Sequence, residues 1–206
     1  MNSTIGIIEE VFGSPGRIAV LRLLANSSVS LTGRQVAELA KLTPAGAARV
    51  LDRLASLSVV RRRRVGRAVL HELERDSDLV QTIVLPVFEA EAELQTRLER
   101  DLAETFGPES ISVVLFGSVA RREAEPGSDI DVLVVAHSDA EAEGLEHVAA
   151  EESGRYFRTY GKPLSVIVKT QRQLQGRKPA FVREAITDGI QVAGRALKEV
   201  VGGSQR

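Results

Sequence analysis

The amino-acid sequence predicts an α+β protein built from two parts that are joined by a long helix. The first part shows three short stretches of helical apolar periodicity, followed by two β-prone segments around a glycine. A longer helical pattern then runs to Gly107-Pro108, which stops it. Beyond that point short apolar strands alternate with helical stretches, so we expect an α/β part with a small mixed sheet. The expected domain boundaries are 1–76, 77–107 and 108–206.

Length and charge support this organisation. A chain of 206 residues can form one large domain or two small ones. Its net charge of −1 gives no general affinity for polyanions, but residues 26–70 hold nine basic and two acidic side chains. That stretch therefore carries +7 and the remainder carries −8. Such a division indicates a part that faces nucleic acid, joined to something else.

Composition also excludes several classes of protein. Without cysteine the chain has neither disulfides nor thiolate zinc sites, which fits a reducing cytosol. The N-terminal residues include Glu9 and Glu10 and lack the long apolar core of a secretory signal. No uncharged apolar run approaches the roughly 20 residues that span a bilayer. We therefore expect a cytoplasmic protein with no membrane partner.

The first third of the chain predicts three helices. Apolar residues recur at helical spacing over 14–28, 31–42 and 43–57. Ser14-Pro15 is a typical helix start, and Thr32 and Thr43 are the expected N-caps of the next two helices. The tight connection between the second and third helices predicts a helix-turn-helix.

A basic β-hairpin is predicted after the third helix, over Val60–Leu73. Its tip is Val65-Gly66-Arg67, where glycine supplies the unusual backbone angles. Four consecutive arginines, Arg61–Arg64, lie on one arm. They can form a solvated edge strand, since charged edges discourage aggregation, or a surface that contacts DNA. Their position after a helix-turn-helix favours DNA.

The segment Ser14–Leu73 resembles the winged helix-turn-helix domain of small bacterial transcription regulators. The resemblance rests on the order of the elements and on the placement of basic residues. It implies that Pro44–Leu57 is a recognition helix for double-stranded DNA and that the hairpin is a wing. Small residues at the start of this helix would allow close approach, and two of its arginines lie one turn apart. The expected DNA-binding residues are Thr43, Ala45, Gly46, Arg49, Arg53, Arg61, Arg63, Arg64 and Arg67.

A long helix is predicted from Pro86 to Phe106. Its apolar residues recur every three or four positions, with charges between them. This stripe can pack within the chain or pair with its twin in a homodimer. A dimer would suit the two-fold symmetric sites that winged-helix proteins often bind.

The second part contains two closely spaced carboxylates in the motif GSVARREAEPGSDIDVLVV, residues 117–135. Gly117 and Ser118 lie between an apolar strand and a short helix expected over Val119–Glu125, at a turn whose N–H groups favour an anion. Asp129 and Asp131 are two residues apart on the next strand, so they face the same side and repel each other. A cation removes this repulsion, and Mg²⁺ binds carboxylates together with phosphate oxygens. The motif therefore predicts a site for Mg²⁺ and a nucleoside triphosphate.

This motif resembles the nucleotidyltransferase fold of DNA polymerase β, particularly its minimal prokaryotic members, with supporting elements to about Gly194. The resemblance implies that the nucleotide is bound by Gly117, Ser118, Arg121 and Ser128. It also implies that Asp129 and Asp131 are catalytic and bind Mg²⁺, with ATP as the expected nucleotide. Arg122 stands where many members have glycine. The implied chemistry is attack of a hydroxyl on the α-phosphate, with pyrophosphate leaving.

The sequence departs from this family at one position. Active members use a third carboxylate, usually on the next strand, which is predicted here over Leu164–Val168. Depending on register its place falls on Ser165 or Ile167, and neither is acidic. The other acids considered as replacements are Glu151, Glu152 and Asp188. The missing acid weakens the prediction of catalysis more than that of nucleotide binding.

Two functions are consistent with these patterns. In the first, the protein is a DNA-binding transcriptional regulator whose second part binds Mg²⁺ and a nucleotide or has lost catalysis. In the second, it is an active nucleotidyltransferase that modifies a protein, an RNA or a small molecule, and its winged helix serves targeting or autoregulation. An antitoxin-like role, with a protein partner, belongs to the second. The intact basic hairpin and the missing third carboxylate favour the first.

Overall fold

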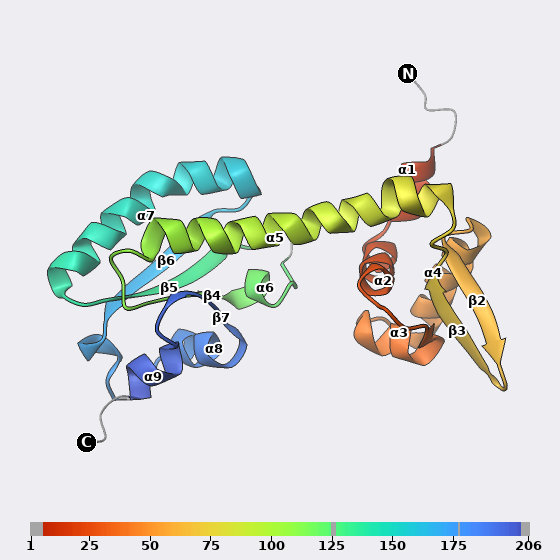
Figure 1. Ribbon diagram of the computed structural model, residues 1–206. Helices are drawn as coiled ribbons and strands as arrows, with labels where there is room; N and C mark the ends of the chain where they lie inside the picture. The colour runs from red at the N-terminus through yellow and green to blue at the C-terminus, as the bar shows by residue number, and fades with distance from the viewer. Residues whose placement is uncertain (1–5, 125–126, 177, 203–206) are drawn as a thin grey trace. The chain divides into compact units, whose positions relative to one another are not determined.

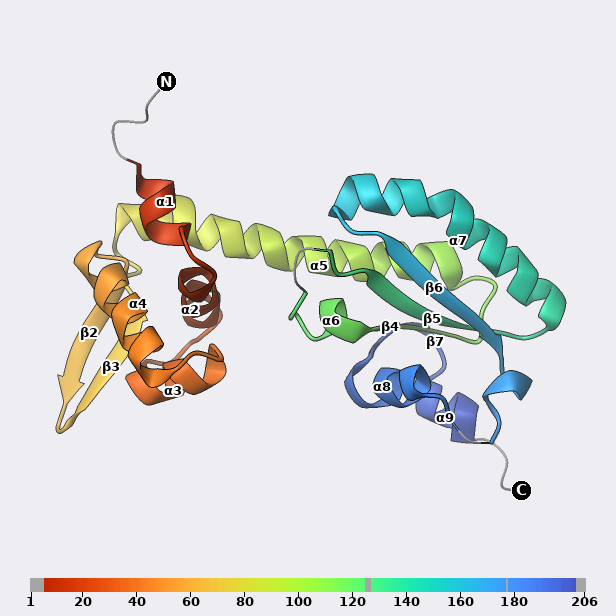
Figure 2. The ribbon, with the colours of Figure 1, turned by 180° about the vertical axis from the view of Figure 1, so that it is seen from behind.

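The structure is a computed structural model that describes residues 6–124, 127–176 and 178–202. The chain divides into two compact units, Met1–Ala92 and Glu93–Arg206, which Figures 1 and 2 show from opposite sides. Helix α5 (Leu85–Phe106) contributes residues to both units. The domain boundaries drawn from the sequence stay a prediction. Within the described ranges, no helix has both the length and the apolar character that crossing a membrane requires.

The first unit combines helices with a three-stranded antiparallel sheet. Its elements before the long helix are α1 (Ile7–Phe12), α2 (Pro15–Ala25), β1 (Leu31–Thr32), α3 (Gly33–Leu39), α4 (Pro44–Ser56), β2 (Val60–Val65) and β3 (Ala68–Leu73). The strand order is β1-β3-β2. Buried aliphatic side chains from α2, α3 and α4, such as Leu21, Val36 and Leu51, form its core.

The predicted helix starts are confirmed. Ser14, Thr32 and Thr43 each accept a hydrogen bond, through the side-chain oxygen, from the backbone N–H three residues later. At Thr32 the side chain of Gln35 also accepts a hydrogen bond from the Thr32 N–H, which completes a capping box. These local bonds fix where α2, α3 and α4 begin, because each one satisfies a backbone donor that has no partner within its helix.

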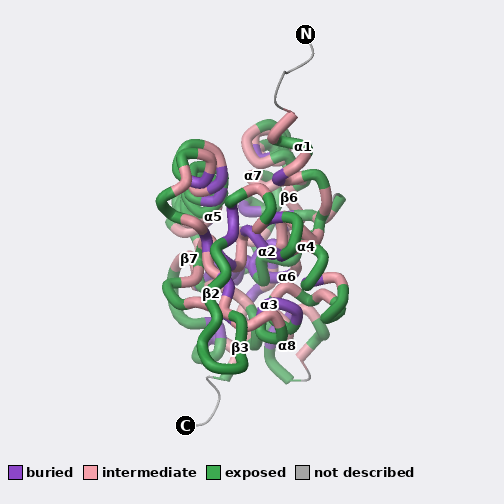
Figure 3. Tube along the Cα trace, turned by 90° about the vertical axis from the view of Figure 1, so that its right-hand side faces the viewer, coloured by how far each residue is buried: buried purple, intermediate pink, exposed green. Residues whose placement is uncertain are grey.

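The predicted hairpin is also confirmed, with β2 and β3 paired over residues 60–73 and Gly66 at the tip at φ +60°. Side chains alternate along a strand, so successive arginines of β2 point to opposite faces. All of β2 after Val60 is exposed, and Figure 3 shows the hairpin largely in the colour of exposed residues. The hairpin is therefore a solvent-facing ribbon with charge on both sides.

The long helix begins earlier than the sequence predicts. A π-helical turn, Val80–Val84, runs directly into α5. Val80 and Val84 are buried in the core of the first unit, and this packing stabilises the turn although its apolar residues do not follow a clear helical spacing. Leu98, Leu102 and Phe106 are buried in the core of the second unit, so intrachain packing is confirmed for this end of α5. The homodimer stays a prediction.

The second unit is an α/β domain around a four-stranded mixed sheet. After α5 its elements are β4 (Ser112–Phe116), α6 (Gly117–Ala120), β5 (Ile130–Ala136), α7 (Asp139–Tyr160), β6 (Leu164–Thr170), the 3₁₀ turn η2 (Arg172–Leu174), α8 (Ala180–Asp188), β7 (Ile190–Gly194) and α9 (Leu197–Gly202). The strand order is β6-β5-β4-β7. Strands β5 and β6 are parallel, and β4 is antiparallel to both of its neighbours. The small mixed sheet is therefore confirmed.

Helices cover both faces of this sheet. Helices α5 and α7 lie on one face, and α8 and α9 lie on the other (Figure 1). Side chains of β5 alternate between the two cores: Ile130, Val132 and Val134 face α5 and α7, whereas Leu133 and Val135 face α8 and α9. By the same alternation Asp131 points to the side of α8 and α9.

Helix α6 differs from the sequence prediction. It spans only Gly117–Ala120 and does not continue through the arginines that follow. Arg122 adopts a left-handed backbone conformation with φ +57°, which a right-handed helix cannot continue. The predicted helix over Val119–Glu125 is therefore wrong beyond Ala120, and Glu125 and Pro126 lie outside the described residues. Arg122 occupies the position where many proteins with this motif have glycine.

We expect Arg122→Gly to stabilise the second unit by about 0.5–1 kcal/mol. A left-handed conformation costs an ordinary residue about 1–2 kcal/mol, and the freedom of glycine in the unfolded chain offsets part of the gain. Both tyrosines of the chain, Tyr156 and Tyr160, lie in this unit, so urea denaturation followed by tyrosine fluorescence reports on it. Arg122→Ala is the matched control, because it removes the same charge but keeps Cβ. Equal midpoints for all three proteins would contradict the assignment of strain.

Candidate functional site

The two halves of the predicted motif meet where β4 gives way to α6. Strands β4 and β5 pair so that Phe116 lies opposite Asp131. The next residue, Gly117, is buried and has φ +74°. A Cβ atom at Gly117 would lie 2.4 Å from Oδ2 of Asp131. The carboxylate of Asp131 therefore packs against the backbone of Gly117, in a space that only glycine leaves open.

The two aspartates differ in their surroundings. Asp129 is exposed just before β5, whereas Asp131 is half-buried within the strand. Burial raises the pKa of Asp131, and the negative charge of Asp129 raises it further. A hydrogen bond from Ser165 acts in the opposite direction. Because the ionised form of Asp131 is disfavoured by desolvation and by a like charge, a cation beside it would be stabilising. Oxygen donors of this kind suit Mg²⁺.

The serines of the motif flank this contact. Ser118, in α6, is half-buried, and its carbonyl accepts a hydrogen bond of 2.8 Å from the N–H of Glu123. Ser128 is half-buried directly before Asp129. Nζ of Lys162, from the turn between α7 and β6, lies 3.4 Å from the carbonyl of Ser128. Sequence reasoning missed Lys162, because only the parallel pairing of β5 and β6 brings its turn to the motif.

Arg121 is exposed at the end of α6, and its guanidinium pairs with two carboxylates. Its Nη1 lies 2.5 Å from Oε1 of Glu184 on α8, and its Nε lies 3.2 Å from Oε2 of Glu123. These hydrogen bonds, the one to Glu184 first, raise the pKa of Arg121. The sequence predicted a phosphate-binding role for Arg121 but gave no sign of Glu184, which lies 63 residues away along the chain.

The register of β5 and β6 decides between the two positions considered for the third carboxylate. The strands are parallel, with Asp131 opposite Ser165 and Leu133 opposite Ile167. The position beside Asp131 is therefore Ser165, whose hydroxyl hydrogen-bonds with the Asp131 carboxylate. Strand β6 supplies a neutral oxygen at this place and no negative charge.

The other acids considered for this role are engaged or exposed elsewhere. Glu152 pairs with Arg155, and Glu151 lies 3.3 Å from His147, in both cases within α7. Asp188 is exposed at the end of α8. Over residues 6–124, 127–176 and 178–202, no three acidic or histidine side chains lie close enough to hold a metal ion together. Mg²⁺ bound by Asp129 and Asp131 would therefore complete its coordination with phosphate oxygens and water.

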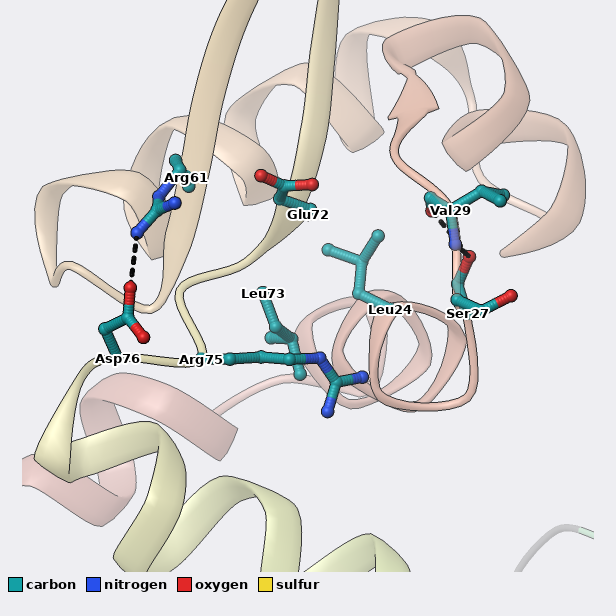
Figure 4. Close-up of a pocket in the computed structure, with 9 residues that line it drawn as sticks. Leu24, Ser27, Val29, Arg61, Glu72, Leu73, Arg75 and Asp76 are labelled. Atoms are coloured by element: carbon teal, nitrogen blue, oxygen red, sulfur yellow. Dashed lines mark hydrogen bonds and ion pairs between the residues drawn. The ribbon is translucent and has the colours of Figure 1, made fainter.

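In the first unit, the predicted DNA-binding residue Arg61 forms ion pairs with two acidic side chains. Its guanidinium forms hydrogen bonds with Glu74 and lies 3.0 Å from Oδ2 of Asp76. Figure 4 shows Arg61 directed at Asp76 on the rim of a pocket of about 270 Å³, which Glu72 and Arg75 also line. The hydrogen bonds to Glu74 and then Asp76 raise the pKa of Arg61.

Two further arginines of this surface have acidic partners. Nη2 of Arg53 lies 3.1 Å from Oε2 of Glu10 in α1. Arg62 of β2 pairs with Asp52 of α4, which joins the hairpin to that helix. The positive charge read from the sequence is thus partly neutralised, and Arg53 and Arg61 are less available to an anion than their positions along the chain suggest.

A second set of arginines is unpaired. In the part of the chain that the structure describes, their side chains form no ion pair or hydrogen bond, and they are Arg34, Arg49, Arg63, Arg64 and Arg67. Arg34, which sequence reasoning did not select, lies at the start of α3 and lines a hollow of about 710 Å³ between α3, α4 and β3. The roles of all these arginines stay predictions.

Comparison with known proteins finds a family similarity within the second unit. Residues 96–188 match the family model described as "Nucleotidyltransferase domain". The match covers β4, α6 and β5, and with them the Gly117–Asp131 contact. This part of the chain is therefore similar to a nucleotidyltransferase domain. None of the curated proteins matches the sequence.

Several solved structures align with parts of the chain. One is RV1404 from Mycobacterium tuberculosis, at 21% identity and a TM-score of 0.34, over 46% of this chain and 65% of that one. Another is the MarR family transcriptional regulator SPO1453 from Silicibacter pomeroyi DSS-3, at 20% identity and a TM-score of 0.37, over 48% and 71%. A third is a toxin–antitoxin structure with AMP-PNP, at 18% identity and a TM-score of 0.32, over 49% and 73%. TM-scores of this size carry no argument about the fold, so the description of the fold depends only on the elements given above.

We expect Gly117→Ala to destabilise the second unit by about 2–4 kcal/mol, through strain at positive φ and overpacking against Asp131. The control is Gly127→Ala, because Gly127 also has positive φ, +88°, but a Cβ atom added there would meet no other atom within 4 Å. The control should lose only about 1–2 kcal/mol, from backbone strain alone. Tyrosine fluorescence during urea denaturation measures both. Equal losses would show that Asp131 does not pack against Gly117.

Proposed function

We propose that the protein is a cytoplasmic DNA-binding transcriptional regulator whose nucleotidyltransferase domain binds Mg²⁺ and a nucleotide but transfers poorly or not at all. In this proposal the first unit is a winged helix-turn-helix, with α4 as the recognition helix and the β2–β3 hairpin as the wing. The observation that carries it is the set of arginines on α4 and the hairpin that have no ion pair among the described residues, in a chain whose net charge is only −1.

The start of α4 supports a nucleic-acid contact. Thr43 and Ala45 are exposed there. A Cβ atom at Gly46 would lie 3.0 Å from Oγ1 of Thr43, so glycine keeps the N-cap uncrowded. Arg49 follows on the exposed side of the helix. A narrow helix start with an unpaired arginine one turn later suits approach to base edges and phosphates.

The hairpin supports a contact with phosphates. Arg63 and Arg64 point to opposite faces of β2, and Arg67 follows Gly66 at the tip. A ribbon with unpaired cations on both faces can lie between two phosphate backbones. Phosphate contacts of this kind release counterions and make binding fall with salt.

The second unit supports nucleotide binding more than transfer. Asp129 and Asp131 would hold Mg²⁺, and the Gly117-Ser118 turn would hold phosphates. Transfer also requires stabilisation of charge on the attacking and leaving oxygens, which metals clamp in this chemistry. Ser165 offers no negative charge to complete such a metal site, and this disfavours an active transferase.

We expect Arg63→Ala/Arg64→Ala to weaken binding to duplex DNA by about tenfold or more and to reduce the salt slope by about 2, because two phosphate contacts are lost. Fluorescence anisotropy of labelled DNA from its own promoter, at several salt concentrations, measures both. Arg61→Ala/Arg62→Ala is matched in charge, but its arginines are already paired with acids. It should change the slope much less. Equal slopes for both variants would contradict a wing that contacts phosphates.

We expect calorimetry to detect binding of Mg-ATP to the wild type and at least about a tenfold loss in Asp131→Asn, because one metal ligand is removed. The other common nucleoside triphosphates serve as a specificity series. Asp188→Asn, an exposed aspartate of the same unit, is the control and should bind as the wild type does. An absence of heat with every nucleotide would reduce the second unit to a scaffold.

A further inference from the structure

Helix α8 carries a glutamate, Glu184, on the same side of the sheet as Asp131. Asp131 and its neighbour Ser165 point to the side of the sheet that α8 and α9 cover, as Leu133 and Ile167 do. Helix α8 packs there through Val182 and Ala185. Glu184, between these two in sequence, is half-buried. It is the acid of α8 that reaches the motif, through its ion pair with Arg121.

Asp131 and Glu184 approach the same helical turn from different elements. Asp131 packs against Gly117 at one end of α6. Arg121 ends the turn, and its N–H donates a hydrogen bond of 3.2 Å to the carbonyl of Gly117. These two residues are four positions apart, which is about 6 Å along a helix. Consistent with this closeness, the charge of Glu184 raises the pKa of Asp131 and the charge of Arg121 lowers it.

Glu184 occupies Nη1 of Arg121 and Glu123 occupies Nε, so a phosphate bound by both Nη1 and Nη2 would compete with Glu184 for the guanidinium. A phosphate accepts two parallel hydrogen bonds from arginine and carries more charge than one carboxylate. If the phosphate takes Arg121, the carboxylate of Glu184 is left half-buried beside two other acids. An uncompensated charge in such a place is destabilising, and a cation removes the penalty.

We infer that Glu184 is the third acidic group of this nucleotide site, held by Arg121 in the free protein and released toward the metal when a triphosphate engages Arg121. The inference rests on the proposed binding of Mg²⁺ and a nucleotide. It supplies from α8 the negative charge that β6 lacks at Ser165. Glu184 thereby has two states, one paired with arginine and one facing the cation.

The test is Glu184→Gln, with two separate binding measurements. Calorimetry with ATP in the presence of EDTA should show about tenfold tighter binding, because Arg121 has lost its shortest carboxylate contact. Electron paramagnetic resonance of Mn²⁺, with a saturating non-hydrolysable ATP analogue, should show a metal affinity lower by about tenfold or more. A rise in metal-free ATP affinity together with a fall in Mn²⁺ affinity is the result that the exchange predicts.

Glu123→Gln is the matched control. It removes the other carboxylate partner of Arg121, so it should also tighten metal-free ATP binding, but it should leave Mn²⁺ affinity unchanged. If Glu184→Gln leaves Mn²⁺ affinity at the wild-type value, the inference is overturned while the nucleotide site stands. If the affinities for ATP and for Mn²⁺ both fall and the urea midpoint falls with them, Glu184 only connects α6 to α8 through its ion pair. That result also overturns the inference. If the wild type binds neither ligand, the proposed function itself fails.

Discussion

The carboxylate of Asp131 lies against the backbone of Gly117, and the rest of the candidate site depends on this contact. It follows from the pairing of Phe116 with Asp131 between β4 and β5. Because β4 must turn away at φ +74° directly after that pair, α6 starts at the carboxylate and carries Arg121 to the side of α8. The same strand places Ser165 beside Asp131 through the parallel pairing with β6. One register on each side of β5 therefore brings Gly117 and Ser165 to the carboxylate.

Charge pairing divides the arginines of the first unit into two kinds. Arg61 and Arg62 hold the hairpin to acids at its base and on α4, so they contribute to the structure of the unit. Exposed pairs of this kind add little to stability, but they hold the side chains in place. Arg63 and Arg64 have no such partner among the described residues. Within the hairpin, the arginines without an ion pair among the described residues thus lie toward the tip, and the paired ones lie toward the base.

Local features of this protein were predictable from the sequence, and features that depend on pairing between distant segments were not. The N-caps at Thr32 and Thr43 and the glycine tip of the hairpin are set by a few neighbouring residues. The Gly-Ser turn and the two aspartates were recognisable because the chemistry of a metal and phosphates restricts residue type and spacing. The choice of Ser165 over Ile167 needed the register of two parallel strands. The pairing of Arg121 with Glu184 joins α6 to a helix far along the chain, and no pattern within either segment indicates it.

The absence of an acid on β6 has a physical consequence for the free protein. An additional carboxylate fixed beside Asp131 and Asp129 would repel both without a cation, and burial and then the charge of Asp129 already raise the pKa of Asp131. A serine at residue 165 donates a hydrogen bond instead and so relieves part of that repulsion. Placing the additional acid on α8, where Arg121 neutralises it, keeps the site stable when no ligand is bound. In the exchange that we infer, the third negative charge would reach the site only when a phosphate competes with Glu184 for Arg121.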